Sequence, residues 1–281
     1  MPVVLGLVSA VVWGTADFLG GASARRSPAT AVVLGSQLTG LLLATPFVVV
    51  GIGTEVVGRD GLLGAVAGVV GGSALILFYR GLALGRMGMV APLSALVTAG
   101  LPVAWGVVAQ RDRPGGVAVA GIVVALVAVV LVTREPSDAG DRTAASRRGA
   151  LLGAASGVGF GVVFICFSEV DAASGLWPVF MARVAWVPLL AVALSVGGRG
   201  LLPAAPDRAA VVSAGMLDFG ANTAFVFAAH RGLTSVVAPV ASLYPAATVL
   251  LARFVLDERL QRHQVAGLLL ALVGLVLLGV A

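Results

Sequence analysis

The chain contains no lysine, a single cysteine and few charged residues of either sign. Charged side chains make up 11% of the 281 residues, whereas a soluble globular protein carries about 25%. The sequence therefore has too little charge to cover a surface that faces water. Because Cys166 is alone, a disulfide within the chain and a CxxC metal or redox motif are both excluded.

Motifs that carry enzymatic chemistry are also missing. The sequence has no HExxH, no phosphate-binding Walker loop and no GxSxG. Asp17 and Asp218 lack the Gly-x-Gly-Asp context of an intramembrane aspartyl protease. We therefore expect a protein that is not an enzyme and that uses no cofactor and no metal ion. The net charge is +5, but the arginines form no basic stripe interleaved with aromatic residues, so we expect no nucleic-acid partner.

Apolar residues, in contrast, make up 59% of the chain, and the mean hydropathy is +1.06. A membrane-spanning helix needs roughly 20 mostly apolar residues, and a helix pairs all its backbone groups within one such segment. We predict an all-α membrane protein with ten transmembrane helices. We expect the first helix to remain part of the protein, because no basic segment precedes it. The ten windows are 2–21, 29–50, 61–79, 89–109, 116–133, 149–168, 176–196, 209–229, 236–256 and 264–281.

The sequence also repeats itself. VAPLSAL at residues 90–96 matches VAPVASL at residues 237–243, an offset of 147. Gly6 and Gly14 match Gly153 and Gly161 at the same offset. A chain that carries two copies of one unit is organised as two copies.

The longest polar segment falls midway along the chain and separates the copies. We predict a first five-helix repeat at residues 1–133, a polar linker at 134–148 and a second five-helix repeat at 149–281. Five crossings leave the second repeat starting on the opposite side of the membrane, so the two repeats must be inverted. Inverted repeats are a recurring architecture of secondary transporters, with the solute site between the repeats.

The arginines are distributed unevenly over the connections between spans. Thirteen of the eighteen fall after odd-numbered spans and four fall on the opposite side. Since basic residues favour the cytoplasmic side, this count places both termini outside the cell. We expect a multi-pass protein of the plasma or inner membrane, from a bacterium.

Several segments carry the signature of a known family. Trp13-Gly14 stands in the first span, YRGLAL stands at residues 79–84, and residues 236–274 have the pattern of two closing spans. Arg183 falls where a basic residue is often found in the second helix of the repeat. In the closing segment the expected residues are Pro239, Pro245, Glu258 and Gly267. On these features both copies resemble the EamA family of the drug/metabolite transporter superfamily, in its ten-helix form.

The resemblance implies transport of a small metabolite or drug but does not name it. It implies that both termini lie in the cytoplasm, which differs from the expectation of the arginine count. The first copy departs from the pattern at three positions. Thr98 stands where the second copy has Pro245, and Asp112 replaces the glutamate. The lysine often seen after the first span is missing, and Arg25 is the nearest basic residue.

Ionisable groups inside the spans are costly and are therefore candidates for function. Asp218 is the deepest, and Asn222 lies one turn further along the same helical face. We expect the pair to serve the solute and ion pathway, the alternative being a hydrogen-bonded pair that joins helices. Asp17 either belongs to this pathway or reaches the interface. Arg183 either extends to the interface, meets an anionic group of the solute or pairs with Asp218.

Two rings and four prolines complete the candidate set. Trp13 and Tyr244 lie deep in their spans and are candidates for lining a pocket. Proline removes a backbone donor and kinks a helix, and matched kinks in corresponding helices of inverted repeats indicate a central site. A role in helix shape alone is the alternative. The helix-kink candidates are Pro92, Pro102, Pro239 and Pro245.

Together these features predict a secondary transporter that moves a small polar metabolite or drug by alternating access. We expect export, coupled to protons through Asp218. The alternatives are an uncoupled facilitator or exchanger and a membrane scaffold that carries no solute. The expected partners are a small-molecule solute and membrane lipid, and both a monomer and a homodimer agree with the sequence.

Overall fold

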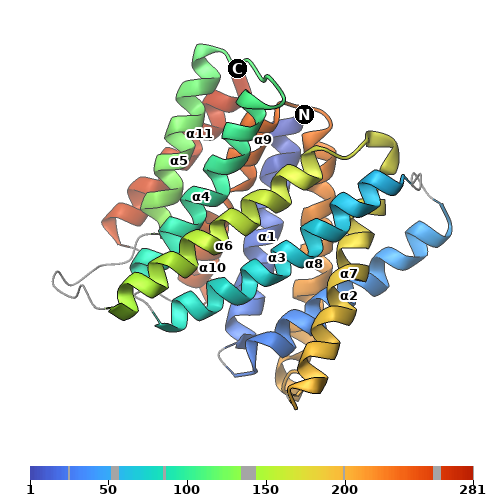
Figure 1. Ribbon diagram of the computed structural model, residues 1–281. Helices are drawn as coiled ribbons and strands as arrows, with labels where there is room; N and C mark the ends of the chain where they lie inside the picture. Colours follow the sequence, from blue (N-terminus) through green and yellow to red (C-terminus); the bar gives the residue numbers. More distant parts are fainter. Residues whose placement is uncertain are drawn as a thin grey trace.

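The computed structural model describes residues 1–24, 26–51, 57–84, 87–133, 144–198, 200–255 and 261–280. Within these ranges the chain consists of α-helices with short connections and two single-turn 3-10 helices, and it contains no strand (Figure 1). The prediction of an all-α membrane protein is confirmed. The α-helices are α1 (Pro2–Ala24), α2 (Ala29–Val49), α3 (Gly58–Leu84), α4 (Met87–Val108), α5 (Gly116–Thr133), α6 (Ala144–Ser168), α7 (Trp177–Val196), α8 (Arg208–Ala229), α9 (Thr234–Ala241), α10 (Tyr244–Val255) and α11 (Arg262–Val280).

The described helices are long and apolar enough for a multi-pass membrane protein. Seven of them reach the length and hydropathy of a membrane span, namely α1, α2, α3, α6, α7, α8 and α11. Shorter apolar stretches occupy α4 and α5. Each predicted window holds one helix, except the ninth, which holds α9 and α10. The chain begins and ends at the same end of the bundle (Figure 1), as an even number of crossings requires.

The ninth window, predicted as one helix over residues 236–256, is two helices. α9 ends at Ala241, and α10 begins at Tyr244 after a turn. Pro245 explains the break, because it has no N–H to donate to the carbonyl of Ala241, four residues earlier. A proline is well tolerated in the first turn of a new helix. The corresponding helix of the first half, α4, has Thr98 at this position and is uninterrupted.

The predicted linker is also shorter than expected. α6 begins at Ala144, so the last five residues of the segment 134–148 are helical. Residues 134–143 lie outside the described residues.

Small residues allow several helices to approach one another closely. A Cβ atom added at Gly64 or Gly68 of α3 would meet the backbone of α7 at Pro178 and Ala182. A Cβ atom at Gly215 of α8 would likewise meet the backbone of α2. Such contacts are typical of membrane bundles, where packing rather than hydrophobic exclusion drives association. They fix α2 and α8, and α3 and α7, at close distance.

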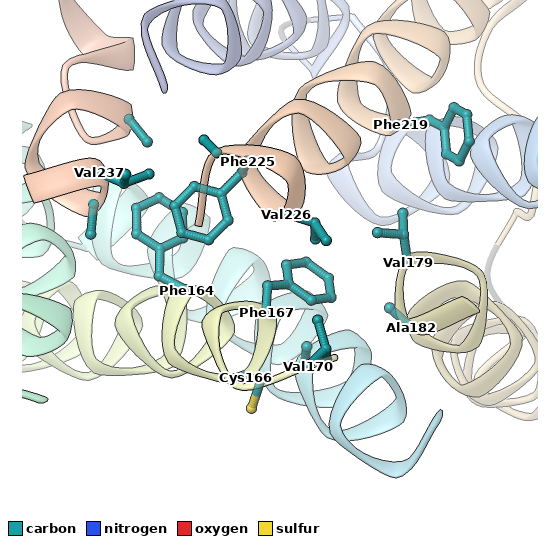
Figure 2. Packing of buried hydrophobic residues seen from close by; sticks show 14 of the residues in the cluster. Phe164, Cys166, Phe167, Val170, Val179, Ala182, Phe219, Phe225, Val226 and Val237 are labelled. Carbon is teal, nitrogen blue, oxygen red and sulfur yellow. The ribbon is translucent and has the colours of Figure 1, made fainter. Parts of the chain in front are cut away.

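The largest buried apolar cluster lies where α6, α7, α8 and α9 meet (Figure 2). Phe164 of α6 and Phe225 of α8 are stacked, with ring centroids 4.5 Å apart. Phe167 packs beside them, and Val179 and Phe219 lie at the other end of the cluster (Figure 2). This apolar layer supports the polar residues described next.

Candidate functional site

Polar side chains from four helices converge on the carboxylate of Asp218 in α8. Oδ1 of Asp218 accepts hydrogen bonds from Trp13 Nε1 at 3.2 Å and from Asn222 Nδ2 at 3.1 Å. Oδ2 accepts a hydrogen bond from Gln37 Nε2 at 3.1 Å and pairs with Arg183 Nη2 at 2.7 Å. We call these five residues the Asp218 cluster. It joins α1, α2, α7 and α8, two helices from each half of the chain.

Arg183 is enclosed by protein groups, and its side chain is only 3% exposed. Nη1 donates a hydrogen bond to the carbonyl of Val179 at 2.9 Å, and the guanidinium carbon lies 5.6 Å from the centroid of the Phe219 ring. Nε lies against Gly40 of α2 and has no hydrogen-bond partner among the described residues. Of the three fates predicted for Arg183, pairing with Asp218 is the one observed.

Trp13 connects the Asp218 cluster to the apolar layer below it. Its ring is stacked on Phe164, with centroids 5.3 Å apart and planes 17° from parallel. It also contacts Phe225, at a centroid distance of 5.9 Å. The indole thus has an apolar body packed in the core and an N–H group directed at Asp218, an arrangement typical of buried tryptophan.

Asp17 follows Trp13 by one turn of α1, and its side chain is exposed. It lies within electrostatic range of Asp218 and of Tyr244. No described residue donates a hydrogen bond to Asp17 or forms an ion pair with it. The two aspartates of the region therefore differ, because the oxygens of Asp218 are occupied by donors and those of Asp17 accept none from the residues that the structure describes.

Tyr244 and the four prolines lie in the fourth and ninth windows. Tyr244 begins α10, and its backbone carbonyl lies against α1. Pro239 is inside α9, and Pro245 is in the first turn of α10. Pro92 and Pro102 lie within α4. Among the described helices the matched positions thus differ, since the helix is interrupted in the second half and continuous in the first.

Comparison with known proteins assigns the second half of the chain. Residues 147–280 match the model of the EamA-like transporter family. The matched residues are thus similar to that family. The match agrees with the resemblance found in the sequence and suggests a membrane transporter of the drug/metabolite transporter superfamily.

The fold of the chain is shared with solved structures. A solved structure described as "Crystal structure of protein" superposes with a TM-score of 0.81, covers 98% of this chain and 95% of its own, and is 16% identical. At that identity the likeness shows the fold alone. It is one of 29 chains that match. No curated protein matches the sequence.

One member of the Asp218 cluster, Gln37, was not predicted from the sequence. The candidates were ionisable groups within the spans, and glutamine carries no charge. A neutral amide in the middle of an apolar window is nevertheless a signal, because side-chain amides in membrane helices form hydrogen bonds between helices. Gln37 donates to Asp218 as such a residue would.

Two other buried carboxylates lie at connections between helices. Asp207 accepts a hydrogen bond from Ser27 Oγ at 2.7 Å, and Asp60 accepts one from Ser174 Oγ at 2.6 Å. The aspartate side chains are 0% and 1% exposed. The offsets 207 − 60 and 174 − 27 both equal 147, so one contact is made twice. We call the two pairs the Asp–Ser clamps; the shared offset was the signal in the sequence that could have revealed them.

Proposed function

We propose that the protein is a secondary transporter of two inverted five-helix repeats, which exports a small polar organic solute by alternating access. The observation that carries this proposal is the Asp218 cluster. Polar and ionisable groups inside a membrane bundle face its interior or a water-filled pathway and mark solute sites. α1 and α2 supply Trp13 and Gln37, and α7 and α8 supply the other three members. A site shared by both halves is what transport between inverted repeats requires.

The packing of the helices supports the division into two repeats. α1, the first helix of the first half, packs against α8, the third helix of the second half. α6, the first helix of the second half, packs against α3, the third helix of the first half. If the first and second halves of the chain are exchanged, the pair α1–α8 therefore becomes the pair α6–α3. α1 begins at the end that carries the termini, and α6 begins at the other end (Figure 1), as inversion requires.

Individual contacts support the same exchange. An added Cβ atom at Gly121 of α5 would meet Leu278 of α11, and one at Gly267 of α11 would meet Val132 of α5. The offsets 267 − 121 and 278 − 132 both equal 146. The Asp–Ser clamps obey the same rule with an offset of 147. Contacts that recur at one offset, with the helices exchanged, are the pattern expected of a duplicated unit folded against its own copy.

The residues of the polar site, in contrast, are not repeated in the two halves. At the offset of 147, Gly71 stands where the second half has Asp218, and Phe164 stands where the first half has Asp17. The chain thus has a polar region around Asp218 and a region without these carboxylates at the related position. The two halves thus differ in sequence at the polar site, although their helices pack in the same way. This difference supports a site that binds one asymmetric solute.

Proton coupling completes the proposal. Asp218 is the carboxylate that the sequence favours, but each of its oxygens already accepts two contacts, so a proton can be added only by displacing a donor. Asp17 is exposed, and its oxygens are unoccupied among the described residues. We therefore assign the exchangeable proton to Asp17, and to Asp218 the role of holding α1, α2, α7 and α8 in register.

Solute flux tests this function. Cells that express the wild type or Arg183→Met are compared by mass spectrometry for the solutes that they retain and release. A solute that depends on the wild type is then followed in lipid vesicles that contain the purified protein and a pH gradient. We expect the gradient to accelerate export, and Asp17→Asn to abolish that acceleration.

The outcomes separate the candidate functions. Flux that ignores the pH gradient indicates an uncoupled facilitator. If no solute depends on the wild type, transport is contradicted and a scaffold is favoured. Full dependence on the gradient in both Asp17→Asn and Asp218→Asn removes the coupling role from this region.

A further inference from the structure

Six helices of the bundle form two groups that are related by exchange of the halves. α3 and α4 pack on α6, and α8 and α9 pack on α1. We call these sets the α6 group and the α1 group. The groups contact each other mainly where α4 packs on α9 and where α6 packs on α8. Alternating access requires contacts between two such groups to open at one end of the bundle while they stay closed at the other.

A carboxylate of the α6 group caps a helix of the α1 group. Oδ2 of Asp112, in the connection that follows α4, accepts hydrogen bonds from the backbone N–H of Ser235 at 2.9 Å and from its hydroxyl at 2.7 Å. Ser235 lies in the first turn of α9, where N–H groups have no partner within the helix and a negative charge is favourable. Leu233, which precedes α9, makes no side-chain capping bond. α9 therefore takes its cap from the other group.

The backbone after α4 is arranged for this contact. Among the described non-glycine residues Arg111 alone has a positive φ, at 59°, and this left-handed conformation is costly for a residue with a Cβ atom. The N–H of Asp112 donates to the carbonyl of Gly106 at 2.9 Å. A Cβ atom added at Gly106 would meet Oδ2 of Asp112 and the backbone nitrogen of Ser235. A strained residue and a glycine thus bring the carboxylate to α9.

A second polar contact joins the two groups. Nε2 of His230, at the end of α8, lies 2.9 Å from the carbonyl oxygen of Val170, just after α6. The ring nitrogen is the donor, because a carbonyl only accepts. Further into the bundle Phe164 of α6 stacks on Phe225 of α8 (Figure 2). Both contacts between the groups therefore close the end of the bundle that carries the termini (Figure 1).

The donors of these two contacts are not repeated in the first half of the chain. At the offset of 147, Gly88 stands where the second half has Ser235, and Ala83 stands where it has His230. Neither glycine nor alanine has a side-chain donor. The acidic partner is repeated, as Glu258, but the hydroxyl and the imidazole are not. The sequence thus provides side-chain contacts for closing one end of the bundle that it does not provide for the other.

We propose that Asp112 and His230 form a latch that holds the transporter closed at the end that carries its termini. The opposite end, whose related positions lack the two donors, opens more readily. The inference rests on the proposed transport function and adds the state in which the protein waits for its solute. Opening at the latched end requires both contacts to break. Without solute the site is therefore reached from the end opposite the termini.

Thiol labelling measures how often each end opens. Cys166, the only cysteine, is replaced by serine, and one cysteine is then placed at Ala238 or at Ser23. Ala238 lies one turn beyond Ser235 in α9, and Ser23 lies in the last turn of α1 at the opposite end; both residues are 0% exposed. The rate at which the purified full-length protein in detergent reacts with a maleimide follows the fraction that is open at that position. We expect Ser23→Cys to react faster than Ala238→Cys.

Three variants and a control assign the rate to the latch. We expect Asp112→Ala to raise labelling of Ala238→Cys at least about tenfold, because hydrogen bonds to a charged group are the strong ones, and His230→Ala to raise it about threefold. Labelling of Ser23→Cys should not rise. Asp112→Asn retains an acceptor and should have a smaller effect. The matched control is Asp171→Ala, at an exposed aspartate of the same end whose carboxylate is bonded within its own turn, and we expect it to change neither rate.

The readouts distinguish the latch from the transport function. Unchanged labelling of Ala238→Cys in both alanine variants overturns the latch, and so does an equal rise at both reporters, which a loss of stability would produce. Faster reaction of Ala238→Cys than of Ser23→Cys in the wild-type background overturns the proposed resting state. The labelling uses no solute, so the expected rates without flux of any solute in vesicles overturn transport and leave the latch. Flux together with unchanged labelling overturns the latch and leaves transport.

Discussion

The ion pair between Arg183 and Asp218 leads us to predict that removal of one partner costs more stability than removal of the other. Asp218→Asn removes the only described counter-ion of a guanidinium that is 97% buried, and an uncompensated buried charge costs roughly 3–5 kcal/mol. Arg183→Met leaves a carboxylate that is 23% exposed and keeps its hydrogen bonds from Trp13, Gln37 and Asn222. We expect this second loss to be smaller, about 1–3 kcal/mol.

The double variant tests the coupling directly. With both charges removed neither group is left unpaired, so we expect a loss at least about 1 kcal/mol smaller than the sum of the single losses, within the range seen for residues in contact. The measurement is unfolding of the purified protein in micelles by increasing dodecyl sulfate, followed by circular dichroism. Losses that add within about 0.5 kcal/mol, or a larger loss for Arg183→Met than for Asp218→Asn, would refute the reasoning.

Three further predictions concern packing and hydrogen bonds, and each is checked by the same unfolding measurement. Gly68→Ala places a methyl group against the backbone of α7 and should destabilise the protein by about 1–3 kcal/mol. In the control, Gly20→Ala, the added methyl group has no neighbour within 4 Å and should stabilise α1 by about 0.5–1 kcal/mol. Equal effects of the two substitutions would contradict the packing. Ser27→Ala leaves the buried Oδ2 of Asp207 without a described donor and should cost about 1–3 kcal/mol. Ser174→Ala leaves Oδ2 of Asp60 with the N–H of Asp171 as its donor and should cost less, about 0.5–1.5 kcal/mol. A larger loss for Ser174→Ala than for Ser27→Ala would contradict these contacts. Trp13→Phe keeps the ring contacts and removes the donor to Asp218, so we expect a loss of about 0.5–1.5 kcal/mol, and no loss would mean that the hydrogen bond is not made.

The sequence predicted the helices well, because hydropathy over some twenty residues is a local property. It missed the break in the ninth window for the same reason, since the residues around Pro245 are as apolar as an unbroken span. The proline itself was noted as a kink, but whether a proline kinks or ends a helix depends on neighbouring helices. Pro102 lies inside the uninterrupted α4, so the residue type alone does not decide.

The site could be predicted in part. Asp218 and Asn222 were placed on one face because four residues make one helical turn, and the contact between them is confirmed. The pairing with Arg183 was one alternative among three, because contacts between helices depend on how they pack. Gln37 was missed because it is uncharged. The sequence also could not show that Asp218 accepts four contacts while Asp17 accepts none from the described part of the chain, since this difference depends on donors from four separate helices.

The interruption between α9 and α10 has a consequence for the affinity of the solute site on each side of the membrane. If the two halves were equivalent and exchanged conformations during transport, the solute site open to one side of the membrane would be equivalent to the site open to the other. In this chain the helix of the second half is divided into α9 and α10 before Pro245, whereas the corresponding α4 is continuous at Thr98. The two halves are therefore not equivalent at this position. Affinity for cargo should then differ between the two compartments, with tight capture on one side and easy release on the other.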